Sequence, residues 1–312
     1  MSRPAGPSAA AARRFIADTI ERHCGDRPSA INRRGGGLTN LVFQVRAGDR
    51  GFIVRMHGDA GKIEDYLKER WAMSRARQAG VPTPRVLEVG RAPAGWPYMV
   101  LEEVAGIEAT RHPERMPIVA EMGSYAARLH RVRTHGYGRE FDGSNGRLAR
   151  QSSWRDYLHS ELAVEQAIDT LRRHRMLNAD QLVALREAVE EMSRWTRRPA
   201  LQHGDLRLKN LIVEADSGRI VALLDWENCL SGPPPYWDLS IALHDLGMDQ
   251  KEALLDGYGL SAGAYARALP FLRAFNVLNY APTIAELARR HDRRGLAWCR
   301  VRLAGGFDLN LV

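Results

Sequence analysis

The stretch that decides the fold is LQHGDLRLKN at Leu201–Asn210, together with the hydrophobic run that ends in LLDWE at Leu223–Glu227. The first segment holds Asp205 and, five residues later, Asn210, and the second segment holds Asp225. Phosphoryl transfer needs one oxygen that positions the substrate hydroxyl and receives its proton, and further groups that hold metal ions on the phosphates. We therefore predict a phosphotransferase in which Asp205 is the catalytic base and Asn210 and Asp225 bind Mg²⁺.

Length and composition limit the classes of protein to consider. The chain has 312 residues, 45% of them hydrophobic, which favours two lobes around large cores. The formal charge of +8 comes mostly from scattered arginines, so a solvated surface and an anionic nucleotide are favoured over nucleic acid as its cause. No apolar run approaches the roughly 18 residues of a membrane span, and the N-terminus does not resemble a secretory signal. Three widely spaced cysteines suit a reducing cytoplasm. We expect a cytoplasmic monomer or homodimer that binds neither nucleic acid nor membranes.

The first part of the chain is expected to form a small antiparallel lobe. Apolar residues alternate over 41–45 and again over 52–56, with a glycine-containing turn between them, and this pattern predicts a β-hairpin. A helix over 8–24 precedes the hairpin. A second helix is expected over 63–79, because Gly80 ends its pattern. Two further strands follow in VPTPRVLEVG and YMVLEEV.

From about residue 113 the chain changes character and becomes mainly helical. Apolar spacing predicts the helices 117–132, 154–174 and 178–197, then a helical region after 236 with breaks at Gly259, Gly263 and Pro282. A short hairpin over 211–224 carries the predicted metal ligand at its end.

These elements predict an α+β fold with two lobes. Residues 1–103 would form an N-lobe with a first helix, a nucleotide-binding antiparallel sheet and a second helix. Residues 104–312 would form a larger C-lobe with the catalytic hairpin, a helical core and substrate-binding helices.

The N-lobe contains several residues that suit nucleotide binding. The segment RRGGGLTN offers Gly36 and Gly37, whose backbone N–H groups can approach phosphates, and the side chains of Thr39 and Asn40 as donors. A glycine-rich β-turn is the alternative reading. 

Two further pairs of residues complete the predicted nucleotide site. Arg55 on the second hairpin strand could contact the α- and β-phosphates, and Glu69 on the following helix could hold it in place; a surface ion pair is the alternative. In VLEEVAG, the carbonyl of Glu102 and the N–H of Val104 could meet an adenine base, unless the segment is merely the end of a strand.

Residues around the motif are assigned supporting roles. His203 is expected to brace the loop, and Asp238 in PPYWDLS is expected to accept hydrogen bonds from backbone N–H groups of that loop. Lys209 could reach the γ-phosphate or be solvated. Glu227 could ligate a second metal ion or hydrogen-bond within its own loop.

Together these segments resemble the aminoglycoside phosphotransferase family, the small-molecule branch of the kinase-like fold, over roughly residues 30 to 245. The segments are GGLTN (Gly36–Asn40), FIVRMH with Arg55, AGVPTPRVL (Ala79–Leu87), VLEEVAG (Val100–Gly106), HGDLRLKN (His203–Asn210), LLDWE (Leu223–Glu227) and YWDLS (Tyr236–Ser240). The resemblance implies a bilobal, protein-kinase-like fold and transfer of the γ-phosphate of MgATP or MgGTP to a hydroxyl. His-Gly-Asp replaces the His-Arg-Asp of protein kinases, and the chain has no Asp-Phe-Gly or Ala-Pro-Glu segment, so we expect no protein substrate.

The acceptor is less well defined by the sequence. The stretch Gly136–Leu158 is similar to hygromycin-type phosphotransferases, which points to an aminoglycoside or aminocyclitol antibiotic, for resistance or self-protection. Asp156, Glu161 and Glu165 lie on the expected helix after Trp154 and could hold ammonium groups, although a solvated helix face is the alternative. A metabolic kinase for choline, a sugar or an amino alcohol is the second hypothesis. A nucleotide-binding pseudokinase is the third, and the intact motif argues against it.

Overall fold

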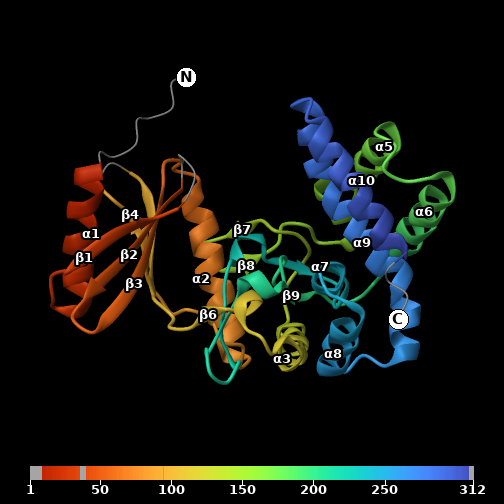
Figure 1. The fold of residues 1–312 in the computed structure, drawn as a ribbon. Helices are drawn as coiled ribbons and strands as arrows, with labels where there is room; N and C mark the ends of the chain where they lie inside the picture. Colours follow the sequence, from red (N-terminus) through yellow and green to blue (C-terminus); the bar gives the residue numbers. More distant parts are fainter. Residues whose placement is uncertain (1–8, 36–39, 94, 309–312) are drawn as a thin grey trace.

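The computed structural model describes residues 9–35, 40–93 and 95–308, and it forms two lobes (Figure 1). The N-terminal lobe is a five-stranded antiparallel sheet in the order β1-β2-β3-β5-β4, with one helix against each face. Its elements are α1 (Ala9–Cys24), β1 (Ala30–Arg34), β2 (Asn40–Ala47), β3 (Arg50–His57), α2 (Lys62–Gln78), β4 (Val86–Arg91) and β5 (Pro97–Glu102).

The alternation of side chains along β5 explains why both faces of the sheet are covered. Tyr98 and Val100 belong to the core shared with α1, whereas Met99 and Leu101 belong to the larger core that includes α2. Successive side chains of a strand point to opposite faces, so an unbroken apolar strand predicts burial on both sides. In Figure 1, α1 lies on the outer face of the sheet and α2 on the face toward the C-terminal lobe.

The segment between the lobes leads directly to the catalytic hairpin. After β5 ends at Glu102, β6 (Ile107–Glu108) pairs with β10 (Leu211–Val213), which also pairs with β11 (Ile220–Leu223). Gly106 allows the segment before β6 to lie close to β10, since a Cβ at that position would lie 2.4 Å from the carbonyl oxygen of Val213. We propose that the boundary between the lobes lies in the residues between β5 and β6.

The C-terminal lobe is mainly helical, with short strands around the motif. Its helices are α3 (Arg115–Leu129), α4 (Trp154–Asp156), α5 (Val164–Arg173), α6 (Ala179–Ser193), α7 (Tyr236–His244), α8 (Met248–Tyr258), α9 (Ala262–Arg289) and α10 (Arg293–Asp308). Its other strands form two pairs, β7 (Phe141–Asp142) with β8 (Arg147–Leu148) and β9 (Ala200–Gln202) with β12 (Leu230–Gly232). Short helical turns are η1 (Ala109–Arg111), η2 (Tyr157–Glu161), η3 (Leu208–Asn210) and η4 (Trp226–Asn228).

The expected α+β, bilobal fold is therefore confirmed, two local expectations are wrong, and one strand was not expected. Strand β1 was not anticipated, because its residues AINRR lack the apolar alternation of β2 and β3. The helix expected over 154–174 is divided by the five-residue π turn η2 and by Ala163, whose φ is 49°. The breaks expected at Gly263 and Pro282 are absent from α9, which continues through both. Burial of α9 against neighbouring helices offsets the roughly 3 kcal/mol that an interior proline costs a helix.

Among the described residues, no helix is both long and apolar enough to cross a membrane.

Candidate active site

The predicted catalytic loop follows β9 and makes a turn that needs glycine. Gly204 has a φ of +84°, and a Cβ there would lie 2.0 Å from the carbonyl oxygen of Asn228. A side chain at this position would therefore be strained in its backbone and blocked by a neighbouring loop. The turn directs His203 inward and leaves Asp205 partly exposed.

Asp238, near the start of α7, accepts hydrogen bonds from the backbone of this loop. Its two carboxylate oxygens accept from the N–H of His203 at 2.8 Å and from the N–H of Gly204 at 2.7 Å. His130 Nε2 is a third partner of Asp238, at 3.0 Å. Burial raises the pKa of Asp238, but hydrogen bonding and the charge of His130 outweigh burial, so the net pKa is lowered. The carboxylate is thus held in its charged form inside the core.

His203 acts as a structural brace. Its ring is fully buried, and burial lowers the pKa of the imidazole, so the neutral form is favoured. Nε2 lies 2.8 Å from the carbonyl oxygen of Leu224, and Nδ1 accepts from the N–H of Asp205 at 3.2 Å. The first contact ties the loop to the residue after β11, next to Asp225, and the second holds the loop's own backbone at Asp205.

Asp205 is surrounded by donors on both carboxylate oxygens. Arg207 Nε lies 2.7 Å from Oδ1, while Lys209 Nζ at 3.1 Å and Asn210 Nδ2 at 3.0 Å approach Oδ2. Burial raises the pKa of Asp205, but the charge of Arg207 and the contacts of Asn210 and Lys209 lower it below its usual range. Asp205 is therefore ionised at neutral pH, as a group that receives a proton must be.

Arg207 links the candidate base to the C-terminal helix. Its Nη1 lies 3.0 Å from Asp245, which follows α7, and Asp245 also pairs with Arg302 of α10. Neither this network nor the role of His130 was predicted from the sequence. Arg207 stands only two residues after Asp205, which is the one local signal that could have drawn attention to it.

Replacing Arg207 by glutamine is expected to shift the pH dependence of catalysis. Loss of the guanidinium removes the main charge that lowers the pKa of Asp205, so this pKa should rise. Because the base must be ionised, the acid limb of kcat/KM should move to higher pH, and activity should fall first at low pH. The measurement is a pH–rate profile of both proteins. An acid limb at an unchanged pH would contradict the influence of Arg207 on the base.

Asp225 and Asn210 provide suitable ligands for a magnesium ion. No three His, Cys, Asp or Glu side chains within 9–35, 40–93 and 95–308 gather closely enough to hold a metal ion by themselves. Mg²⁺ normally takes one or two protein carboxylates and fills its remaining positions with phosphate oxygens and water, so this arrangement fits it. Burial raises the pKa of Asp225, and the neighbouring Glu227 raises it further, so a nearby cation would stabilise its charged form.

The side-chain amide of Asn210 is held by Asp205 through its nitrogen. Its Nδ2 donates to Asp205, which leaves the amide oxygen as the atom that can accept a cation. Asp225 adopts a left-handed backbone with φ 65° and ψ 59°. Glu227 Oε2 lies 3.5 Å from Lys62 Nζ, and Lys68 donates to the Glu227 carbonyl oxygen at 2.7 Å, so α2 holds this loop from the N-terminal lobe.

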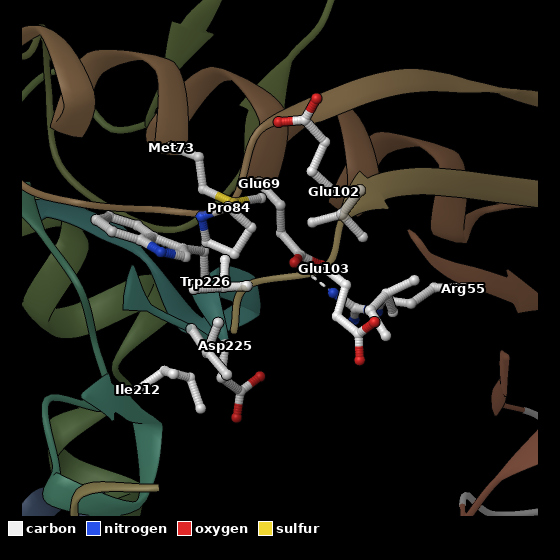
Figure 2. A pocket seen from close by; sticks show the side chains of 13 residues that line it. Arg55, Glu69, Met73, Pro84, Glu102, Glu103, Ile212, Asp225 and Trp226 are labelled. Carbon is white, nitrogen blue, oxygen red and sulfur yellow. Dashed lines mark hydrogen bonds and ion pairs between the residues drawn. The ribbon is translucent and has the colours of Figure 1, made fainter. Parts of the chain in front are cut away.

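A cavity of about 320 Å³ lies between the lobes beside Asp225 (Figure 2). Arg55, Glu69, Glu102 and Val104 all line it, as expected for a nucleotide pocket. Arg55 Nη1 contacts Glu69 Oε2 at 2.6 Å, and the Glu69 side chain is only 1% exposed. Burial lowers the pKa of Arg55, but Glu69 and Tyr66 outweigh burial, so the net pKa is raised and the guanidinium stays charged. A fixed cation and apolar walls suit a nucleotide.

Some predicted site residues are not placed in this cavity. Gly36, Gly37 and Thr39 lie outside the described residues, and Asn40 is described only as the first residue of β2. Glu161 and Glu165 do not lie on the single helix that was expected, because Glu161 is the last residue of η2 and the left-handed Ala163 precedes α5.

The three acidic residues proposed for the acceptor also have different surroundings. Asp156 is exposed, Glu165 pairs with His159 at 2.7 Å, and Glu161 accepts from the N–H of Arg139 at 2.8 Å.

Known proteins include relatives of this chain in sequence and in fold. A family model described as "Phosphotransferase enzyme family" (APH) matches residues 30–275. The chain is 24% identical over 223 residues to the hygromycin-B 4-O-kinase of Escherichia coli, covering 68% of this chain and 61% of that protein. It is 25% identical over 255 residues to the methylthioribose kinase of Exiguobacterium sibiricum, covering 70% of this chain and 62% of that protein. The chain thus spans less than two thirds of the length of either relative.

Solved structures show the same fold at lower identity. The crystal structure of aminoglycoside phosphotransferase APH(4)-Ia superposes with a TM-score of 0.70 at 18% identity, over 98% of this chain and 100% of that chain. A ternary complex of a variant of that protein contains AMP-PNP and hygromycin B, with a TM-score of 0.68 at 18% identity, over 95% of this chain and 99% of that chain. The matched family covers most of the chain and includes every segment of the site described above. The chain therefore belongs to the APH phosphotransferase enzyme family and has its kinase-like fold.

Proposed function

We propose that this protein transfers the γ-phosphate of ATP or GTP to a hydroxyl group of a small molecule. The observation that carries this proposal is that Asp205 and Asn210 are hydrogen-bonded to each other, and that the backbone of Asn210 is hydrogen-bonded to the residue before Asp225, which lines the cavity between the lobes. Asn210 contacts Asp205 through its side chain, and its carbonyl oxygen accepts from the N–H of Leu224 at 2.8 Å, next to Asp225. Hydrogen bonds therefore join the candidate base to one candidate metal ligand, and join that ligand to the residue before the other.

Each residue has a defined role in this proposal. Asp205 would orient the acceptor hydroxyl and receive its proton, Asn210 and Asp225 would hold Mg²⁺, and Arg55 would contact the nucleotide phosphates. The metal ion, once bound, would supply positive charge that stabilises the transferring phosphoryl group. Glu69 would keep Arg55 in position, and Asp238 would keep the loop of Asp205 in position.

An aminoglycoside or aminocyclitol antibiotic such as hygromycin B is the first acceptor that we propose. Support comes from the similarity to hygromycin-B 4-O-kinase. A metabolic kinase is the second candidate, because several carboxylates of the C-terminal lobe, although not Asp156 or Glu161, are already paired with cations. Asp245 pairs with Arg207 and Arg302, Asp169 with Arg172 and Arg173, and Glu165 with His159. Polycationic antibiotics need free carboxylates to bind their ammonium groups.

A growth assay tests the antibiotic proposal directly. Expression in a sensitive bacterium is expected to confer resistance to hygromycin B or another aminoglycoside, and Asp205→Ala is expected to abolish that resistance. Asp180→Ala is a matched control, because Asp180 is an exposed aspartate on α6, outside the residues of the site. Growth equal to that of the empty vector on every antibiotic would contradict the antibiotic acceptor. Phosphorylation of choline, methylthioribose or a sugar by the purified protein would then support the metabolic kinase.

A further inference from the structure

A second cavity, of about 530 Å³, lies between α2, the segment that follows α3, and the β7–β8 hairpin. Its charged lining residues are Arg75 from α2, Arg133 and His135 from the segment after α3, and Arg147 from β8. None of the described residues that line it is an aspartate or a glutamate. It shares no lining residue with the nucleotide pocket.

The three guanidinium groups of this cavity have no counter-ion among the described residues. Arg75 lies over the ring of Trp71, with 6.0 Å from its Cζ to the ring centroid, and this is a contact with a neutral side chain. Arg147 lies opposite Asp142 in the hairpin register, but the Asp142 carboxylate accepts hydrogen bonds from Ser144 and Asn145 instead. Many other surface arginines of this chain do pair with carboxylates, for example Arg172 with Asp169 at 2.7 Å.

Unpaired cations around a concave surface create a positive potential that attracts anions. Guanidinium groups also match phosphate oxygens with pairs of N–H donors. The volume is within the range of sites for small molecules, about 300–1,000 Å³. A neighbouring cavity of about 440 Å³ shares Trp71 and Gly146 with the first, adds Arg70 and Arg77, and likewise has no acidic residue among its described lining. A third cavity, of about 740 Å³, shares His135, Asn145 and Arg147 with the first but is also lined by Glu140 and Asp142, so the positive surface extends toward α2 rather than toward β7. The surface formed by the first two cavities is large enough for more than one phosphate group.

We infer that this cavity is a second binding site, which accepts a small molecule carrying phosphate groups. The ligand would contact elements from both lobes. Arg75 is on α2, the helix that carries Glu69 and thereby positions Arg55. Arg133 forms a β-bridge with Ala200 at the start of β9, the strand that leads to the loop of Asp205. A bound phosphate compound would thus connect the two elements that position the nucleotide side and the acceptor side of the active site.

Isothermal titration calorimetry with inorganic pyrophosphate, in buffer without magnesium, tests this inference without relying on activity. The double variant Arg133→Gln/Arg147→Gln is expected to bind pyrophosphate about tenfold or more weakly than the wild type, because charge-assisted hydrogen bonds are lost. Arg293→Gln/Arg294→Gln is the matched control. It removes the same charge from an exposed part of the chain outside both cavities and should change the affinity by about twofold or less. Thermal unfolding of each variant verifies that it is folded.

A third variant separates this site from the nucleotide pocket. Arg55→Gln should leave pyrophosphate binding intact; loss of binding in this variant would place the ligand in the nucleotide pocket and overturn the inference. An equal loss of pyrophosphate affinity in both double variants would show general attraction of the anion to a basic protein and would overturn the inference. Absence of pyrophosphate binding to the wild type would overturn it as well. Single-stranded RNA serves as a second probe. If the wild type binds RNA more tightly than pyrophosphate, and every variant lowers the RNA affinity equally, the surface attracts polyanions in general. That result would contradict a small-molecule site. Failure of the phosphotransferase proposal would change none of these outcomes.

Discussion

Asp205→Ala is expected to lower kcat by about a hundredfold or more and to leave nucleotide affinity nearly unchanged. Asp205 contacts Arg207, Lys209 and Asn210, and it does not line the cavity between the lobes. Its loss would therefore remove the group that orients the acceptor hydroxyl without removing a wall of the nucleotide pocket. Steady-state kinetics with the acceptor identified by the screen would measure kcat, and calorimetry would measure nucleotide affinity.

Asp205→Asn is the companion variant, because it keeps the shape of the side chain but cannot receive a proton in the same way. Both variants should have a strongly lowered kcat if the carboxylate acts as the general base and also positions the acceptor hydroxyl. Asp180→Ala should retain wild-type kinetics. A kcat within about threefold of the wild type in Asp205→Ala would exclude this residue as the base, since such groups contribute roughly a hundredfold or more.

Asp225→Ala is expected to abolish the gain in nucleotide affinity that magnesium provides. Asp225 is exposed at the edge of the cavity, where partial desolvation and the neighbouring Glu227 raise the pKa of its carboxyl. A divalent ion between this carboxylate and the phosphates would neutralise charge on both sides. Calorimetry should show that the wild type binds the nucleotide about tenfold or more tightly with magnesium than with a chelator, and that the variant shows no such difference.

The backbone at this position determines the best control. Asp225 has a φ of 65°, a conformation that asparagine tolerates better than alanine, so Asp225→Asn removes the charge with less strain. It should show the same loss of magnesium dependence, whereas Glu227→Gln should retain most of it, because Glu227 pairs with Lys62. Magnesium-dependent binding that persists in both Asp225 variants would show that another group holds the metal ion.

Local sequence was sufficient to predict the elements around the motif. The β2–β3 hairpin, α2 and the β10–β11 hairpin were predicted because each has apolar periodicity and turn residues within a few positions of one another. The pairing of Arg55 with Glu69 was expected from the order of strand and helix, and the structure shows the contact at 2.6 Å. The catalytic roles assigned to the motif residues remain predictions for the variants above to test.

The helix over 154–174 shows where local reasoning fails. Its apolar residues recur at helical spacing, but the π turn η2 adds a residue to the turn, and Ala163 then takes a left-handed backbone. Glu161 consequently contacts the backbone of Arg139, whereas Glu165 pairs with His159 on the surface. Local periodicity cannot indicate such a change, because its cause is the packing of distant side chains.

The sequence by itself determined the two-lobe fold and the identity of the motif residues, since those depend on patterns that each lie within about 30 residues. Only the tertiary structure decided which distant side chains contact the motif residues and their neighbours. His130 reaches Asp238 across 108 positions, Arg302 reaches Asp245 across 57, and Arg75, Arg133 and Arg147 meet around one cavity. Such contacts have no local signal, because they arise when helices and loops from separate parts of the chain bury their apolar faces together and thereby bring their polar side chains into reach.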